Sequence, residues 1–443
     1  MAAVPDHIRK KLAALGQEHL LRWAERFDDS MRQALFADID AIEAGQLATL
    51  RAAMKPQAST NIPFTPFPFL ELEDANFPYR LHRDAREATA HGETLLREGK
   101  VAALVVAGGE GTRLGFNRPK GFFPIYPVSG RCLFDGFAAQ LRVIEKRFGR
   151  AVPWYVMTSR ATHDATVKGF KEAKHYDLNP VNISFFTQGE SPVLAPDGRL
   201  LPDASGRIVR SPDGHGGCIE ALACSRMLDD MKKRGVEWIY YFQVDNAMER
   251  VCDPALVGVT ASKDADVGVK VVRKQEPGEK VGVLVERDDH ASVVEYTELS
   301  ETQTNERDTQ GRLRYCAGNT AIHVFRRSFL ERVAGESLPW HAAFKAVPHM
   351  DEAGKIVTPS QPNAYKFERF IFDVFPRAKK LVALEVPRRR DFVPLKDASG
   401  PRSPEGVRKE MQAEWRAWLA HKGEKFDTDA PLEISPERWA ETL

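Results

Sequence analysis

Cysteine, long apolar runs and net charge are all scarce in this sequence, and each shortage excludes a class of protein. The five cysteines are scattered and form no CxxC pair, which is typical of reduced thiols and argues against a disulfide framework or a zinc site. No run approaches the roughly 18 consecutive apolar residues that span a bilayer, and the N-terminal residues lack the apolar core of a signal peptide. We therefore expect a soluble, cytoplasmic protein without a membrane partner.

The charges nearly cancel, since 63 basic residues face 62 acidic ones for a formal net charge of +1. A chain with almost no net charge produces no long-range electrostatic field that would attract a nucleic acid. The sequence also has no basic stripe interleaved with aromatic residues. We expect no nucleic-acid partner, and an anionic ligand must be held by a local group of cations. The length of 443 residues predicts two or three units with a large core.

The pattern of apolar residues divides the chain into three predicted parts. Leucines and aromatic residues at spacings of three and four predict helices over 6–56, and four prolines within 55–69 end that pattern. Short apolar runs then alternate with amphipathic helices, which predicts an α/β fold with a mainly parallel sheet covered on both faces. The predicted parts are an N-terminal helical region over 1–85, a central domain over 86–385 and a C-terminal region over 386–443.

Several elements are predicted individually. We expect strands in "VAALVVA", "WYVMTS", "NISFFTQ" and "EWIYYFQVDN", one helix in "CLFDGFAAQLRVIEKRFG", one in "CIEALACSRMLDDMKKRG" and one in "VRKEMQAEWRAWLAHKG". The β-rich stretch 266–325 is expected to form an insertion or a second lobe beside the sheet. Ligands of such sheets bind beyond the carboxyl ends of the strands. A glycine-rich stretch and Asp245 both follow predicted strands at such ends.

That glycine-rich stretch, "VVAGGEGTRLGFNRPKG" over 105–121, carries the strongest chemical pattern. It fails the Walker motif because Lys120 stands between a proline and a glycine, and it fails the dinucleotide motif because Leu114 takes the place of the third glycine. Its glycines would let backbone N–H groups approach phosphates, with Arg113 as a planar fork and Lys120 as a compact charge. A surface loop with turn glycines and solvated charges is the alternative.

"AGGEGTRLGFNRPKG" resembles the signature of nucleotidyltransferases that join a nucleoside triphosphate to a sugar 1-phosphate. Nine other segments occur in the order of the eukaryote-like UDP-sugar pyrophosphorylase family, and within it they resemble the UDP-N-acetylglucosamine pyrophosphorylases. These segments are "GQEHLLRW", "TQGESP", "SPDGHGG", "FQVDN", "VGVLVER", "VVEYTELS", "AGNTAIHVF", "KFERFIFDVF" and "DFVPLKDA". The resemblance covers most of the chain.

The resemblance implies a Rossmann-like, GT-A-like nucleotidyltransferase domain over 86–385, with 266–325 as its sugar-side lobe. It implies a magnesium-assisted, in-line attack by an oxygen of N-acetylglucosamine 1-phosphate on the α-phosphorus of UTP, which gives UDP-N-acetylglucosamine and pyrophosphate without a covalent enzyme intermediate. The protein must hold two anions in line and neutralise the charge that develops on the transferred group. The sequence leaves the oligomeric state open between a monomer and a weak dimer.

The same resemblance implies roles for individual residues. Arg113 would bind the β and γ phosphates, Lys120 the α-phosphate, and Lys396 would reach the phosphates from the C-terminal region unless it is a plain surface charge. Asp245 would hold the magnesium ion, unless it makes a structural salt bridge or a helix N-cap. The implied nucleotide-binding residues are Gly108, Gly109, Gly111, Thr112, Gln188, Gly214 and His215, and the implied sugar-binding residues are Asp245, Gly282, Glu295, Asn319 and Phe372.

Three alternatives stay open. His215 stands where the resembled enzymes usually have asparagine, and histidine occurs there in related glucose-using enzymes. A UTP:glucose-1-phosphate uridylyltransferase or a broad UDP-sugar pyrophosphorylase is therefore the alternative function. Phe372 and its neighbour Phe370 would lie beside an acetyl group or simply in the core. A non-catalytic nucleotide-sugar binding protein is the third alternative. The joint presence of four charged residues argues against it, namely Arg113, Lys120, Asp245 and Lys396.

Overall fold

The computed structural model describes residues 4–55 and 63–442, which form two compact units. Within the described residues, the first unit takes 4–55, 188–217 and 337–371, and the second unit takes the rest. Residues 56–62 of the predicted proline-rich boundary lie outside the described residues. The division into three parts predicted from the sequence stays a prediction.

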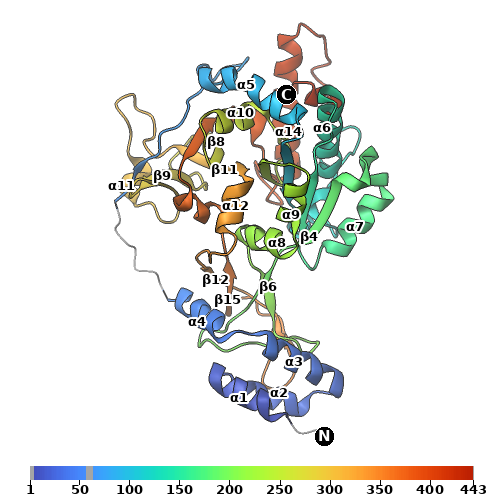
Figure 1. Ribbon diagram of the computed structural model, residues 1–443, viewed down its shortest axis with the longest axis vertical. Coiled ribbons are helices and arrows are strands. Elements are labelled where there is room, and N and C mark those ends of the chain that lie inside the picture. The colour runs from blue at the N-terminus through green and yellow to red at the C-terminus, as the bar shows by residue number, and fades with distance from the viewer. Residues whose placement is uncertain (1–3, 56–62, 443) are drawn as a thin grey trace. The chain divides into compact units, whose positions relative to one another are not determined.

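A sheet is the framework of the second unit, and among the described residues it has ten strands (Figure 1). Four of its strands are parallel in the order β7-β2-β3-β4, and β16 also pairs parallel with β8. These four strands are β2 (Val101–Val106), β3 (Trp154–Thr158), β4 (Ile183–Thr187) and β7 (Trp238–Gln243). The other strands are β1 (Thr65–Pro66), β8 (Val267–Arg273), β9 (Val283–Arg287), β10 (His290–Val294), β11 (Ala317–Arg326) and β16 (Leu381–Glu385). The mainly parallel α/β sheet and the four strands predicted in it are confirmed.

The helices of the second unit have the following bounds, besides several short 3₁₀ turns. They are α5 (Arg83–Arg97), α6 (Leu133–Phe148), α7 (His163–Glu172), α8 (Cys218–Cys224), α9 (Met227–Lys233), α10 (Pro254–Ser262), α11 (Glu301–Asn305), α12 (Arg327–Val333), α13 (Arg388–Asp391), α14 (Pro404–His421) and α15 (Pro436–Ala440). Among the residues that the structure describes, none of the helices has the length and hydropathy needed to cross a bilayer.

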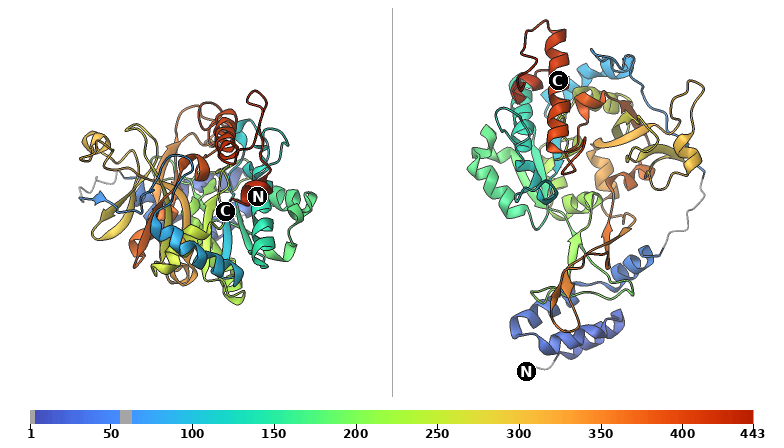
Figure 2. Two further views of the ribbon diagram at one scale, coloured as in Figure 1. Left: turned by 90° about the horizontal axis from the view of Figure 1, so that it is seen from above. Right: turned by 180° about the vertical axis from the view of Figure 1, so that it is seen from behind.

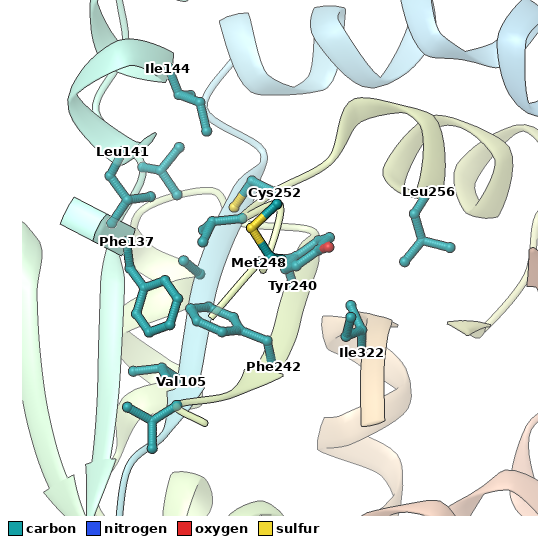
Figure 3. Packing of buried hydrophobic residues seen from close by; sticks show 14 of the residues in the cluster. Val105, Phe137, Leu141, Ile144, Tyr240, Phe242, Met248, Cys252, Leu256 and Ile322 are labelled. Carbon is teal, nitrogen blue, oxygen red and sulfur yellow. The ribbon is translucent and has the colours of Figure 1, made fainter. Parts of the chain in front are cut away.

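Helices cover both faces of the sheet because alternate strand residues point to opposite sides. On one face, Phe137 of α6 packs edge-on against Phe242 of β7 with ring centroids 5.1 Å apart, and Leu256 of α10 belongs to the same core (Figure 3). On the other face, the Tyr155 hydroxyl of β3 donates to Asp230 of α9 at 2.6 Å. Each fully buried aromatic or aliphatic side chain stabilises the fold by about 1.5–3 kcal/mol, so this sheet forms a rigid base for the loops at its edge.

The β-rich stretch 266–325 is part of the same sheet and does not form a sheet of its own. Strand β11 pairs antiparallel with β8 through both of its halves, with β9 through its first half and with β7 through its second half. Between the halves the register shifts, and Ala321 takes a φ of 58°. Such a bulge bends a strand and lets one strand serve two sets of neighbours. The sugar-side role of this stretch stays a prediction.

The single helix predicted in "CIEALACSRMLDDMKKRG" is wrong, because the structure has two helices, α8 and α9, with a break between them. Arg226 precedes α9 with a φ of 62°, a left-handed conformation that ends an α-helix. Both α8 and α9 contact α12. The break therefore lies between two short helices that pack against a common third helix.

The predicted C-terminal helix is confirmed as α14, which is drawn in red in Figure 2. Ser403 caps its first turn by accepting a hydrogen bond from Gly406 N, and Pro404 occupies the first helical position. Trp415 stacks on Tyr126 with ring centroids 6.2 Å apart and lies in the core of the second unit. The C-terminal residues therefore belong to the same packed body as the sheet.

The first unit combines the predicted N-terminal helices with short strands from two later parts of the chain. Its elements are α1 (Asp6–Leu15), α2 (Leu21–Arg26), α3 (Asp29–Ala41), α4 (Ala44–Ala53), β5 (Glu190–Pro192), β6 (Arg210–Pro212), β12 (His341–Lys345), β13 (His349–Met350), β14 (Ile356–Val357) and β15 (Ala364–Glu368). The leucines of the helical stripe are packed with Leu194, Leu200 and Phe367 in one core. Gln17 also donates to Gly198 O at 3.1 Å and accepts from Leu200 N at 2.7 Å. The N-terminal helices are thus packed against later strands of their own unit.

Candidate active site

The glycine-rich stretch forms a folded-back loop at the carboxyl end of β2. Its two arms are joined by hydrogen bonds from Gly111 N to Arg118 O at 3.0 Å and from Lys120 N to Gly109 O at 3.1 Å. A glycine is required at position 111, where the loop turns back, because a Cβ atom there would lie 2.6 Å from the carbonyl oxygen of Phe116. The loop therefore returns Lys120 to the end of β2.

The other predicted residues of this loop are accessible to a ligand. Gly108 is half-buried directly beyond the strand, while Gly109, Thr112 and Arg113 are exposed. A Cβ atom on Gly109 would meet nothing within 4 Å, so the backbone there borders open space. Exposed backbone next to a guanidinium is a suitable surface for phosphate oxygens.

Two lysines from distant parts of the chain meet one carboxylate at the carboxyl edge of the sheet. Asp245 lies two residues beyond β7, and its Oδ2 atom is 3.9 Å from Nζ of Lys120 and 3.9 Å from Nζ of Lys396. The side chains of Asp245 and Lys120 are 14% and 17% exposed, and that of Lys396 is 41% exposed. The structure thus brings together three of the predicted residues, while their roles stay predictions.

The environment of Lys120 is strongly cationic. Burial lowers the pKa of Lys120; Asp245 opposes that effect, and the charges of Lys396 and Arg113 lower the pKa further. Two carboxylates, Asp245 and Asp397, therefore face three cations. A polyanion such as a triphosphate would balance this excess of positive charge.

The segment that carries Lys396 is fixed to the end of β7. Leu395 N donates to Asp245 O at 2.8 Å, and Ala247 N donates to Val393 O at 3.2 Å. The buried side chain of Asn246 accepts from Val393 N at 2.9 Å and donates to the backbone of the same segment. Because these bonds are made by Asp245 and the two residues after it, the carboxylate and the second lysine come from one rigid junction.

A buried group of charges lies behind this junction, and the sequence analysis did not predict it. Lys270, fully buried in β8, is 2.7 Å from Asp253 and 2.5 Å from Asp391. Glu249 accepts from the hydroxyl of Tyr240 at 3.0 Å, and its burial raises the pKa of Glu249 to about 7 against the opposing effects of Lys270 and of its hydrogen bonds. A lysine inside the apolar run "DVGVKVV" was the available signal.

Three of the five residues predicted for the sugar side, Gly282, Glu295 and Asn319, form one cluster in the second unit. Asn319 N donates to Gly282 O at 2.9 Å. A Cβ atom on Gly282 would lie 2.9 Å from Cγ1 of Val293 and 3.0 Å from Oε1 of Glu295. Asn319 begins the bulge of β11, and its Oδ1 atom accepts from Ala321 N at 3.1 Å. The bulge therefore fixes the side chain of Asn319 beside a glycine and a carboxylate.

Three predicted nucleotide-binding residues lie together in the first unit, around Asp213. Asp213 N donates to the carbonyl of Gly189, the neighbour of Gln188, at 3.1 Å. Gly214 has a φ of 83°, and a Cβ atom there would lie 2.5 Å from Arg369 O. Asp213 also forms an ion pair with Arg369. Gly214, Arg369 and the backbone of Gly189, next to Gln188, are thus held in fixed positions within that unit.

His215 packs onto the aromatic part of the same unit. Its Nδ1 atom accepts from Ile371 N at 3.1 Å, and its ring stacks on Phe370 with centroids 5.4 Å apart. Phe370 also stacks on His341, with ring centroids 4.4 Å apart. The histidine is therefore part of an aromatic stack, which an asparagine at this position would not join. The remaining predicted residue, Phe372, is buried in the second unit.

Comparison with known proteins identifies the family. A model of the family described as UTP–glucose-1-phosphate uridylyltransferase matches residues 72–430. The chain belongs to this family. A human relative named UDP-N-acetylhexosamine pyrophosphorylase-like protein 1 is 38% identical over 449 residues, which cover 96% of this chain and 87% of that protein. The resemblance stated from the sequence is confirmed.

Two other matches carry a narrower description. An Arabidopsis thaliana relative named UDP-N-acetylglucosamine diphosphorylase 2 is 33% identical, with 96% of this chain and 88% of that protein covered. The crystal structure of the uridine diphosphate N-acetylglucosamine pyrophosphorylase from Trypanosoma brucei matches with a TM-score of 0.80 at 25% identity, over 95% of this chain and 87% of that chain. The family fold thus extends over nearly the whole chain.

Enzymes of this uridylyltransferase family act on UTP and a sugar 1-phosphate, release pyrophosphate and generally use a divalent metal ion. Within the residues that the structure describes, no group of three His, Cys, Asp or Glu side chains could hold a metal alone. The carboxylate of Asp245 nevertheless suits a hard cation that takes its other ligands from phosphate oxygens and water. The residues present therefore fit a metal that binds together with the nucleotide.

Proposed function

We propose that this chain joins UTP to N-acetylglucosamine 1-phosphate and gives UDP-N-acetylglucosamine and pyrophosphate. The convergence of Lys120 and Lys396 on Asp245, beside an accessible glycine loop, is the observation that carries the proposed reaction. An N-acetylated sugar is chosen on the names of relatives that are 33–38% identical over most of the chain, and N-acetylglucosamine on the name of the relative at 33%. The five cysteines are free thiols, which supports the cytoplasmic location expected from the sequence.

The proposed mechanism is an in-line displacement in which the chain supplies position and charge. Lys120 binds the α-phosphate and offsets the negative charge that grows on the phosphoryl group as the sugar phosphate attacks. Arg113 binds the β and γ phosphates, which leave as pyrophosphate. Lys396, which lies at the same oxygen of Asp245 as Lys120, also binds the phosphates, so that the two lysines hold the reacting groups in line.

Asp245 is the proposed holder of magnesium. When bound there, magnesium would neutralise part of the charge on the phosphate oxygens. The negative charge of Asp245 itself offsets the repulsion between the two lysine charges near it.

The remaining predicted residues are assigned to the two ends of the substrate pair. Gln188 and the backbone of Gly214 bind the uracil, because an amide both donates to and accepts from its polar edge. Glu295 and Asn319 bind the sugar, since a carboxylate and an amide pair with hydroxyl and acetamide groups. A sugar without the matching group would leave these polar side chains unpaired and would bind less tightly.

The test is pyrophosphate release from UTP and magnesium, with N-acetylglucosamine 1-phosphate and glucose 1-phosphate in parallel. We expect a ratio of kcat/KM of about a hundredfold or more in favour of the acetylated sugar, as for a site built around a polar group of its substrate. Glucose is the second candidate because His215 joins the aromatic stack with Phe370. A preference for glucose would keep the mechanism and change the sugar, whereas no release with either would refute the enzyme assignment.

A further inference from the structure

Asn246 directly follows the proposed metal-holding residue, yet its side chain turns away from solvent. The residue is 2% exposed. Its Nδ2 group donates to Asp391 O at 2.7 Å and to Oε2 of Glu249 at 2.8 Å, and its Oδ1 atom accepts from Val393 N at 2.9 Å. Each hydrogen-bonding group of this amide is thus used, which fixes the side chain in one orientation.

Two of these three bonds reach the segment that ends in Lys396. Asn246 pairs with Pro394 across a short antiparallel bridge, and the neighbouring bonds run from Leu395 N to Asp245 O and from Ala247 N to Val393 O. Leu395 O also accepts from Nζ of Lys120 at 3.4 Å. The segment therefore carries Lys396 and contacts Lys120 and the backbone of Asp245. Asn246 is the residue whose side chain anchors it.

The anchor is itself held by the buried charges behind it. Glu249 is kept in place by the hydroxyl of Tyr240 at 3.0 Å, and the side chain of Asp391 by Nζ of Lys270 at 2.5 Å. Both partners of the Asn246 amide group therefore belong to fixed side chains or fixed backbone. Loss of the amide would leave buried donors and acceptors without partners, and the segment would be free to shift.

We propose that Asn246 is a positioning residue that holds Lys396 against Asp245 for the transfer step. This inference rests on the role of Lys396 in the proposed function. A displacement of about 1 Å at a reacting group lowers turnover strongly even when the displaced residue never touches the substrate. Asn246 acts on the reaction only through the segment that it anchors.

A second buried amide provides a matched control. Gln140 is 5% exposed, donates to Glu249 O at 2.8 Å and accepts from Val251 N at 2.9 Å. It therefore ties down the same turn after β7, but its bonds are made with residues 249 and 251 and not with the segment of Lys396. A variant of Gln140 should lose stability as a variant of Asn246 does, without displacing Lys396.

The experiment is a double-mutant cycle in which kcat and KM for UTP are measured. The cycle uses Asn246→Ala, Lys396→Ala and the variant with both changes. The control is Gln140→Ala, measured with and without Lys396→Ala. Rates are measured below the melting temperature of the least stable variant, with Asn246→Ser as a milder replacement should the alanine variant not fold. We expect Asn246→Ala to lower kcat about tenfold or more with a smaller change in KM. When Lys396 is already alanine, the Asn246→Ala substitution should lower kcat by less than about twofold, because Asn246 acts through that lysine. Gln140→Ala should keep kcat within about threefold of the wild type in both backgrounds.

The outcomes separate this inference from the proposed function. Equal effects of Asn246→Ala with and without Lys396 would overturn the positioning role and leave the proposed function intact. A normal kcat for Lys396→Ala would overturn both the role of that lysine and the positioning role. Similar losses of kcat in Asn246→Ala and Gln140→Ala would mean that any loosening of the turn lowers activity, which also overturns a specific role for Asn246.

Discussion

Lys120 offers the most direct test of the proposed mechanism. The substitution Lys120→Ala removes the more buried of the two amines beside Asp245 and leaves Lys396 to pair with that carboxylate. The fold should tolerate the change, because the backbone of residue 120 keeps its bond to Gly109 O. The loss should therefore fall on the reaction and not on folding.

The size of the loss follows from the distances in the site. Two unit charges 3.9 Å apart, the separation of Lys120 Nζ and Asp245 Oδ2, interact by about 4 kcal/mol at an effective dielectric constant of about 20. A phosphoryl oxygen bound at the same separation would gain a similar interaction, of which the part that grows during transfer counts toward kcat. Loss of one such group in other enzymes costs about 3–4 kcal/mol. We expect kcat to fall about a hundredfold or more.

The assay is steady-state pyrophosphate release at saturating UTP, sugar 1-phosphate and magnesium. Arg118→Ala is the matched control, because Arg118 is an exposed cation of the same loop whose guanidinium lies over the ring of Phe122 at 4.7 Å. That variant should keep kcat within about threefold of the wild type. A kcat for Lys120→Ala within the same limit, or an equal loss in Arg118→Ala, would refute the transition-state role of Lys120.

Three further predictions concern the metal, the buried carboxyl and the sugar. Asp245→Asn should raise the magnesium concentration needed for half-maximal rate about tenfold; an unchanged magnesium curve would place the metal elsewhere. Glu249 has a folded-state pKa of about 7, above the usual 4.5, so the folded state keeps a proton that the unfolded state has lost between these values. The free energy of unfolding should therefore fall by up to about 3 kcal/mol as the pH rises from 4.5 to 7. Urea unfolding of Glu249→Gln should not show this fall, and an equal fall in that variant would assign it to another group. Gly282→Ala should raise KM for the sugar 1-phosphate and not for UTP, because the new Cβ would lie 2.9 Å from Cγ1 of Val293 at the proposed sugar side; equal changes in both KM values would contradict that location.

The elements that the sequence predicted well are those whose local pattern and final environment agree. The strand at 101–106 is a continuous apolar run and is buried on both faces, and the helix at 133–148 carries its apolar stripe to the core and ends at Gly149. The glycine loop was also identifiable, because its glycines and cations stand at fixed spacings in one short stretch. Local information was sufficient in each of these cases.

The remaining features depend on contacts between distant parts of the chain. Nothing near Arg226 indicates the left-handed turn that separates α8 from α9, and Ala321 has a positive φ although the sequence supplies no glycine there. Lys270 could be noticed as a charge within an apolar strand, but its partner Asp391 is 121 residues away. Periodicity cannot predict such a pair, because the pairing is determined by the order of strands in the sheet.

The charges of the site and the charges behind it serve two different purposes. At the carboxyl edge, Lys120 and Lys396 share one carboxylate, and this imbalance favours a phosphate ligand in a chain that is otherwise almost neutral. Behind the edge, Lys270 and Arg250 face Asp253 and Asp391 within their own group, so that part needs no ligand to be stable. An enzyme that binds a triphosphate and then releases two charged products needs its ligand-binding charges to be separate from its structural charges. If the buried structural charges rearranged when the ligand bound, the lysines would move during the reaction. The backbone bonds between residues 245–247 and 393–395 are where the two groups of charges meet, and a substitution there should change the rate of transfer more than the affinity for UTP.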